Sequence, residues 1–122
     1  LRKTKYITTS SLVDEVKLAK LQGTYHKLIR SIRATALLIL DDFGLHPFDG
    51  DARQALMDIV EYKYDQSSII LTSQIPINKW HELIGEGTIA DAILDRLIHS
   101  SHRLDLNGDS LRKNKLVINN QS

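Results

Sequence analysis

Two apolar runs constrain the fold of this chain more than any other feature. The runs "ALLIL" (36–40) and "SSIILTS" (67–73) lack the alternation of a half-exposed strand and are typical of strands covered on both faces. Between them, residues 51–64 place their apolar side chains on one stripe of an amphipathic helix. A strand, a helix and a second strand in this order predict a parallel pair joined by a crossover helix.

The segments on either side continue this alternation of strands and helices. We expect a strand over 5–10, followed by a helical region that Ser10 or Ser11 caps and that breaks near Gly23. A short helix should follow from Pro76, and a helix over 88–100 should open with a capping box of Thr88 and Asp91. A last strand is expected over 102–106, with a turn after it. The predicted fold class is therefore α/β, a parallel sheet with flanking helices.

Composition narrows the classes of function. A chain of 122 residues is enough for one domain, and the absence of cysteine excludes a disulfide scaffold and a thiolate metal site. No apolar run is long enough to span a bilayer and the first residues do not form a secretory signal, so we expect a cytoplasmic protein without membrane partners. The net charge of +1 gives no global electrostatic argument for nucleic acid.

Two adjacent acidic residues, Asp41 and Asp42, follow the first apolar run. In parallel sheets the ligand lies beyond the carboxyl ends of the strands, and Mg²⁺ typically takes one or two carboxylates besides water and phosphate oxygens. Asp41 could anchor such a metal, and Asp42 could orient or deprotonate an attacking water. A turn with two solvated aspartates is the alternative interpretation.

Three further polar features support a phosphate site only weakly on their own. Thr72, Ser73 and Gln74 end the second apolar run, where Thr and Ser also commonly form turns. Arg96 borders the apolar stripe of the predicted helix over 88–100, as a snorkelling arginine would, or it could reach a neighbour's phosphate. Arg112, in "DSLRK", is by itself a charge near the chain end.

Together these features resemble the AAA+ ATPases of the IstB/DnaC group, and most closely the IstB-like transposition helper proteins. The string "LLILDDFGL" is similar to their Walker B motif. The block "IILTSQIPINKWHELIGEGTIADAILDRLIHSSHRLDLNGDSLRK" is similar to the family throughout its length. The resemblance covers nearly the whole chain, and it implies ATP and Mg²⁺ as cofactors.

The resemblance implies roles for the residues near the strand ends. Asp41 would hold Mg²⁺, and Asp42 would take the position of the water-activating acid, which is more often Glu in other AAA+ proteins. Gln74, with Ser73 before it, would take the sensor I position and contact the γ-phosphate or the lytic water.

The resemblance also implies roles in an assembly. Arg96 would be the arginine finger that completes the site of an adjacent subunit in an oligomer, and Arg112 would match the sensor II arginine. The family implies double-stranded DNA and a transposase as partners. Basic residues along the first helical region could contact DNA phosphates, or they could form a solvated helix face: Lys17, Lys20, Lys27, Arg30 and Arg33.

One part of a P-loop ATPase is missing from the sequence. No G-x-x-x-x-G-K-[ST] string occurs in the 122 residues, and in the family this loop follows a strand that lies between the strand carrying "LTSQ" and the last one. We therefore expect residues 1–122 to be a single partial AAA+ domain that lacks the first strand and the phosphate loop. The strand over 102–106 would then face a gap, a rearranged sheet or another chain, and nucleotide binding by this chain alone would be weak or absent.

Three other functions stay open at this point. A DnaC-like replicative helicase loader shares the ATPase parts, although "TSQIP" and the last quoted block favour the transposition group. A non-catalytic interaction fragment of the same fold is a second alternative. A receiver-like signalling domain would need a further aspartate on a separate strand end and a lysine after the last strand, which "LDLNGD" does not supply.

Overall fold

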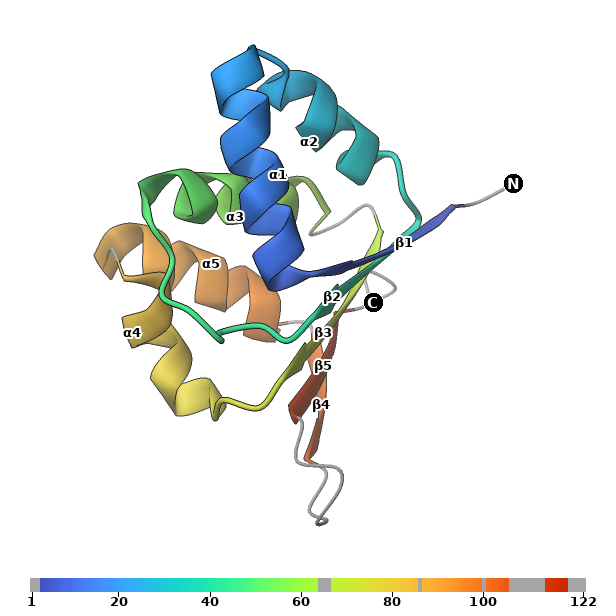
Figure 1. The fold of residues 1–122 in the computed structure, drawn as a ribbon. Helices are drawn as coiled ribbons and strands as arrows, with labels where there is room; N and C mark the ends of the chain where they lie inside the picture. The colour runs from blue at the N-terminus through green and yellow to red at the C-terminus, as the bar shows by residue number, and fades with distance from the viewer. Residues whose placement is uncertain (1–2, 64–66, 86, 100, 106–113, 119–122) are drawn as a thin grey trace.

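The computed structural model describes residues 3–63, 67–85, 87–99, 101–105 and 114–118. Five strands form one sheet in the order β1-β2-β3-β5-β4 (Figure 1). The strands are β1 (Thr4–Thr8), β2 (Leu37–Asp41), β3 (Ser68–Ser73), β4 (Ser101–Asp105) and β5 (Asn114–Ile118). The helices are α1 (Thr9–Gln22), α2 (Tyr25–Arg33), α3 (Gly50–Lys63), the short 3-10 helix η1 (Ile77–Lys79), α4 (Trp80–Ile84) and α5 (Gly87–His99).

The half of the sheet formed by β1, β2 and β3 confirms the predicted α/β class. These three strands are parallel, with α1 and α2 between the first two and α3 between the second and third. The predicted helix break is also confirmed, since Gly23 ends α1 with a φ of 74°, a left-handed conformation that favours glycine. The predicted caps at Ser10 and Ser11 are wrong, because Thr8 is the N-cap and its hydroxyl accepts from the Ser11 amide.

The other half of the sheet differs from the prediction. Strand β4 was expected, but β5 was not, and it runs antiparallel to both β3 and β4. It lies between them, so the sheet is rearranged rather than gapped. The sequence of this segment gives no local signal for that position, because one of its two partners, β3, lies far back in the chain while the other, β4, directly precedes it. The turn expected after β4 lies outside the described residues.

The capping box predicted at the start of α5 is also wrong. Thr88 lies within the first turn of the helix rather than ahead of it. The Asp91 carboxylate lies 2.9 Å from Nε2 of His81, which comes from α4. This contact connects α4 to α5.

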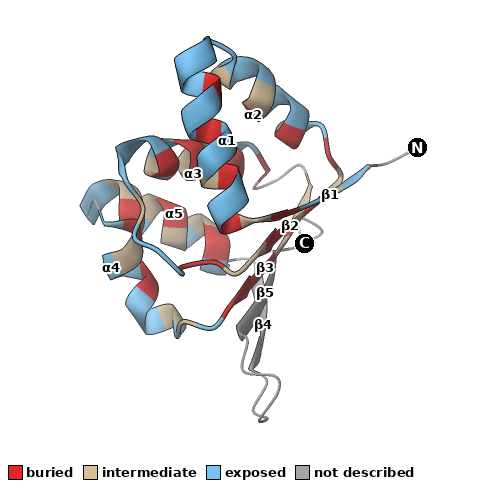
Figure 2. Ribbon diagram, viewed as in Figure 1, coloured by how far each residue is buried: buried red, intermediate tan, exposed pale blue. Residues whose placement is uncertain are grey.

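The core lies between the helices and one face of the sheet. The helices pack on the same side of the sheet (Figure 1), and their buried positions face the strands (Figure 2). Leu38, Leu40, Ile69 and Leu71 point into this layer and are buried together with side chains from α1 to α5. The sequence predicted strands that are covered on both faces. The described residues cover only one face of the sheet fully.

The opposite face of the sheet is partly exposed. Ile39 stands in register with Tyr6 on one side and with Ile70 on the other. Tyr6 is 60% exposed, and Ile39 and Ile70 are partly exposed. We call these three side chains the open face. Among the described helices, none is long and apolar enough to cross a membrane.

Candidate functional site

The acidic pair lies at the carboxyl end of β2, where the chain leaves the sheet. Asp41 is the last residue of the strand, and Asp42 follows it with a φ of 54°. Few side chains adopt this left-handed conformation, although aspartate tolerates it better than most. The Asp42 amide donates to the Thr72 hydroxyl at 3.1 Å, so the turn is tied to the end of β3.

Two hydroxyl groups from neighbouring strands hold the Asp41 carboxylate. The Tyr6 hydroxyl donates to Oδ2 at 2.5 Å, and the Thr72 hydroxyl donates to Oδ1. The Asp41 backbone carbonyl accepts from the Thr9 hydroxyl at 3.0 Å. The carboxylate is thus held from both sides, by β1 and by β3, before any ligand arrives.

Ser73 and Gln74 follow Thr72 at the same edge of the sheet, but in different surroundings. Ser73 is fully buried, and its hydroxyl donates to the Phe43 carbonyl at 2.5 Å and accepts from the Ile75 amide at 3.0 Å. Gln74 is exposed directly after β3. The structure therefore brings Gln74 to the edge that carries Asp41, while Ser73 connects the segment after β2 to the segment after β3.

Of the two predicted arginines, the structure describes Arg96, which lies on α5 next to α3. Arg96, on α5, donates to the Ala92 carbonyl at 3.2 Å and lies 3.7 Å from the Glu61 carboxylate of α3. Its side chain is 29% exposed. An arginine that acts on a neighbouring subunit would have to lie away from its own acidic pair, so this placement is compatible with the predicted role. Arg112 lies outside the described residues.

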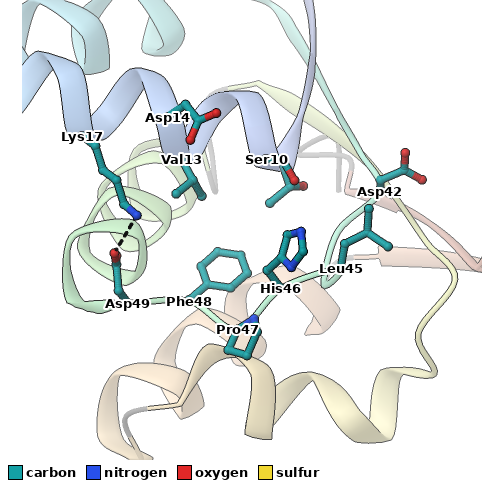
Figure 3. Close-up of a pocket in the computed structure, with 11 residues that line it drawn as sticks. Ser10, Val13, Asp14, Lys17, Asp42, Leu45, His46, Pro47, Phe48 and Asp49 are labelled. Atoms are coloured by element: carbon teal, nitrogen blue, oxygen red, sulfur yellow. Dashed lines mark ion pairs between the residues drawn. The ribbon is translucent and has the colours of Figure 1, made fainter.

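A cavity of about 210 Å³ opens next to Asp42. It lies between the start of α1 and the segment that follows β2 (Figure 3). Ser10 and Val13 line it from α1, and His46 and Phe48 line it from the opposite side, with Asp42 at one end. Asp42 therefore borders a hollow with both polar and apolar walls, as a ligand site requires.

The far end of this cavity is closed by an ion pair. The Lys17 ammonium lies 3.3 Å from the Asp49 carboxylate (Figure 3). Asp49 also accepts from the Ala52 amide at 2.8 Å, at the start of α3. This backbone hydrogen bond, and then Lys17, lower the pKa of Asp49 below its ordinary value, so this carboxylate is charged at neutral pH and neutralises Lys17.

The donor set at the acidic pair fits a hydrated magnesium ion. Within the described residues there is no group of three His, Cys, Asp or Glu side chains that could hold a metal ion by themselves. Mg²⁺ does not need such a cage, because one or two carboxylates are enough when water and phosphate oxygens supply the rest. Asp41 and Asp42 can provide those carboxylates.

Sequence reasoning missed Tyr6 as a member of this site. The residue was assigned to a strand, but its contact with Asp41 depends on how β1 pairs with β2. Thr72 was noted with Ser73 and Gln74, although not as a partner of Asp41. The register of the parallel strands was the missing information, because it alone tells which hydroxyls reach the carboxylate.

Comparison with known proteins agrees with the predicted family and with the α/β fold. The sequence profile described as "IstB-like ATP binding protein" matches residues 2–117. Two similar proteins of Sinorhizobium fredii, y4pL and y4uH, are named as insertion sequence ATP-binding proteins. The first is 47% identical over 114 residues, covering 93% of this chain and 46% of the relative. The second is 44% identical over 108 residues, covering 88% and 44%.

A more distant relative comes from Geobacillus stearothermophilus and is named as the ATP-binding protein of insertion sequence IS5376. It is 34% identical over 110 residues, covering 90% of this chain and 44% of the relative. The chain thus spans less than half the length of these relatives. Because the family profile covers nearly all of the sequence, the chain belongs to the family of IstB-like ATP binding proteins.

Proposed function

We propose that this chain is part of the Mg²⁺-dependent ATPase core of a DNA transposition helper protein. Residues 1–122 would form one partial AAA+ domain of that core. The observation that carries the proposal is the Asp41 carboxylate, held by Tyr6 and Thr72 at the end of a parallel strand in a chain whose relatives are named as ATP-binding proteins. These relatives are insertion sequence proteins, which favours transposition over replicative helicase loading.

In this proposal the two acids have different tasks. Asp41 would hold Mg²⁺, which would neutralise charge on the phosphates of ATP. Asp42 would orient or deprotonate the attacking water, with one methylene less reach than a glutamate. Gln74 is exposed at the same edge and would contact the γ-phosphate or that water. Ser73 would act in the same sensor position, although its hydroxyl already binds two backbone groups.

The remaining parts of the proposal concern partners. Arg96 would act as the arginine finger for an adjacent subunit. For this, its guanidinium would have to leave the Glu61 carboxylate and bind a phosphate of the adjacent site. Arg112 would act as the sensor II arginine. Self-association, double-stranded DNA and a transposase complete the proposed set of partners, and the relatives' insertion sequence names support this context.

A chimera tests the proposed ATPase role directly. In it, this chain replaces the matched 114 residues of the y4pL relative from S. fredii, so that the rest of that longer protein is present. We expect Mg²⁺-dependent ATP hydrolysis by the chimera. Asp42→Asn should lower kcat by about 100-fold or more, since general-base catalysis contributes about that much. Asp41→Asn should raise the Mg²⁺ concentration needed for half-maximal activity.

The matched control for the chimera is Asp95→Asn, which removes an exposed carboxylate from α5. It should leave hydrolysis unchanged. A folded chimera that does not hydrolyse ATP, or one in which Asp41→Asn and Asp42→Asn behave like the control, would contradict the proposed function. The 122-residue chain alone should bind Mg-ATP weakly or not at all by titration calorimetry, and a micromolar Kd would refute that expectation.

A further inference from the structure

We infer that Tyr6, on the edge strand β1, is a positioning residue for Asp41. Its phenol hydroxyl holds one oxygen of the Asp41 carboxylate in place. The inference deepens the proposed function, on which it rests for its consequence in metal binding. Its structural part stands on two hydrogen bonds within the chain. Neither the apolar runs nor the acidic pair pointed to this residue.

The register of β1 and β2 brings the two side chains together. Tyr6 stands opposite Ile39, and Thr8 stands opposite Asp41. Tyr6 therefore reaches Asp41 along the diagonal of the ladder, two residues further along β2, a distance that an aromatic side chain can span. The separation of 2.5 Å between the Tyr6 hydroxyl and Oδ2 of Asp41 is that of a hydrogen bond to an ionised carboxylate.

A second hydroxyl holds the other oxygen, so the carboxylate cannot rotate freely. Thr72 donates to Oδ1 of Asp41 and itself accepts from the Asp42 amide. A continuous chain of hydrogen bonds thus runs from β1 through Asp41 to β3 and back to the turn at Asp42. Thr72 is only 8% exposed, whereas Tyr6 is 60% exposed, so Tyr6 is the donor that solvent or a ligand can reach.

This arrangement prepares the carboxylate for a hydrated cation. A carboxylate offers about four lone-pair positions, and the two hydroxyls use one on each oxygen. The side chain is therefore already oriented when a hydrated Mg²⁺ ion arrives. Such preorganisation lowers the cost of binding, because the rotation of the side chain is restricted beforehand.

The test is a pH titration of the Asp41 carboxyl carbon by ¹³C NMR in the 122-residue chain. Tyr6→Phe removes only the hydroxyl and should raise the titration midpoint of Asp41, because a hydrogen bond to the charged form favours that form. We expect about a tenfold increase in proton affinity, a shift of about one pH unit in the midpoint. Amide spectra of the two proteins should otherwise agree, which shows that the fold is kept.

The matched control is Tyr62→Phe, which removes a hydroxyl from a half-exposed tyrosine of α3 whose ring packs over Arg33. It should leave the midpoint of Asp41 where it is. A second variant, Thr72→Ser, keeps the hydroxyl on the other oxygen and should also leave the midpoint in place. If Tyr6→Phe leaves the midpoint unchanged, Tyr6 does not position Asp41 and the inference falls.

The chimera described above separates this inference from the proposed function. There, Tyr6→Phe should raise the Mg²⁺ concentration for half-maximal hydrolysis more than it lowers kcat. A shifted midpoint in a chimera that does not hydrolyse ATP would keep the positioning role and reject the ATPase role. An unshifted midpoint would reject the positioning role whatever the chimera does.

Discussion

The two faces of the sheet differ in what covers them, although their sequences are similarly apolar. On the helix side, Leu40 and Leu71 are buried in the core. On the open face, Ile39 and Ile70 are partly exposed and Tyr6 is largely exposed. Neighbouring residues of one strand thus have opposite surroundings, and each strand contributes to both faces.

The covered face therefore contributes more than the open face to the stability of the described residues. Burial of apolar area stabilises a fold roughly in proportion to the area removed from water, so the open face contributes less than its composition suggests. Parallel sheets are normally covered on both faces. An apolar face that the described residues leave partly exposed is therefore a surface on which further protein is expected to pack.

Truncating Leu71 and its neighbour Ile70, which lie on opposite faces of β3, should give very different losses in the free energy of unfolding. Leu71→Ala should lower the free energy of unfolding by about 3–4 kcal/mol, because it leaves a cavity in the core. Ile70→Ala should cost about 1 kcal/mol, because its side chain is only partly buried. Urea denaturation of both variants, followed by circular dichroism, measures the two values under the same conditions.

Equal losses for the two variants would contradict the difference in packing between the two faces. They would mean that Ile70 is as well packed in solution as Leu71, and therefore that another surface covers the open face. In that case the loss for Ile70→Ala should depend on protein concentration if a second copy is the cover, because association contributes to stability by mass action.

The pH dependence of stability tests whether water reaches the buried side chains on the helix side of the sheet. Lys63, at the end of α3, is fully buried, and its ammonium donates to the Thr35 carbonyl at 2.6 Å and to the Ser67 hydroxyl at 2.9 Å. Burial lowers its pKa from 10.5 to about 8. Between pH 8 and 10.5 the unfolded chain therefore binds more protons than the folded one, and the stability should rise with pH.

The expected gain across that range is about 3 kcal/mol, because each pKa unit corresponds to about 1.4 kcal/mol. Below pH 8 both states carry the proton and the full penalty is present. Lys63→Met is the control, since it removes the titrating group while keeping much of the apolar stem. The difference in unfolding free energy between the two proteins should change with pH in that range, and a constant difference would mean that water reaches Lys63.

The sequence predicted the part of the fold that depends on local patterns. The runs at β2 and β3, the amphipathic helix α3 and the break at Gly23 all follow from periodicity or from backbone preference. Strand β5 was missed, because its place between β3 and β4 depends on pairing with the distant strand β3. In the site, Asp41 and Asp42 could be found because they are adjacent in the sequence. The contact of Tyr6 with Asp41 could not be found, because it depends on how β1 pairs with β2.

The smallest expected change in stability concerns the open face itself. Ile39 lies at its centre, in register with Tyr6 and Ile70. Ile39→Lys should change the free energy of unfolding by about 1 kcal/mol, because the side chain of Ile39 is partly exposed and a lysine can extend its charged end into water. If the proposed self-association uses the open face, Ile39→Lys should also shift the chain towards monomer in sedimentation velocity, because facing copies would have to bury a charge.

Leu21→Lys provides the matched control, since Leu21 is 86% exposed on α1, on the helix side of the sheet. The same charge is added there without touching the open face. If only Ile39→Lys shifts the chain towards monomer, the open face is the surface through which copies associate. If both variants or neither of them do so, the association involves another surface, and the difference between the two faces would concern folding alone.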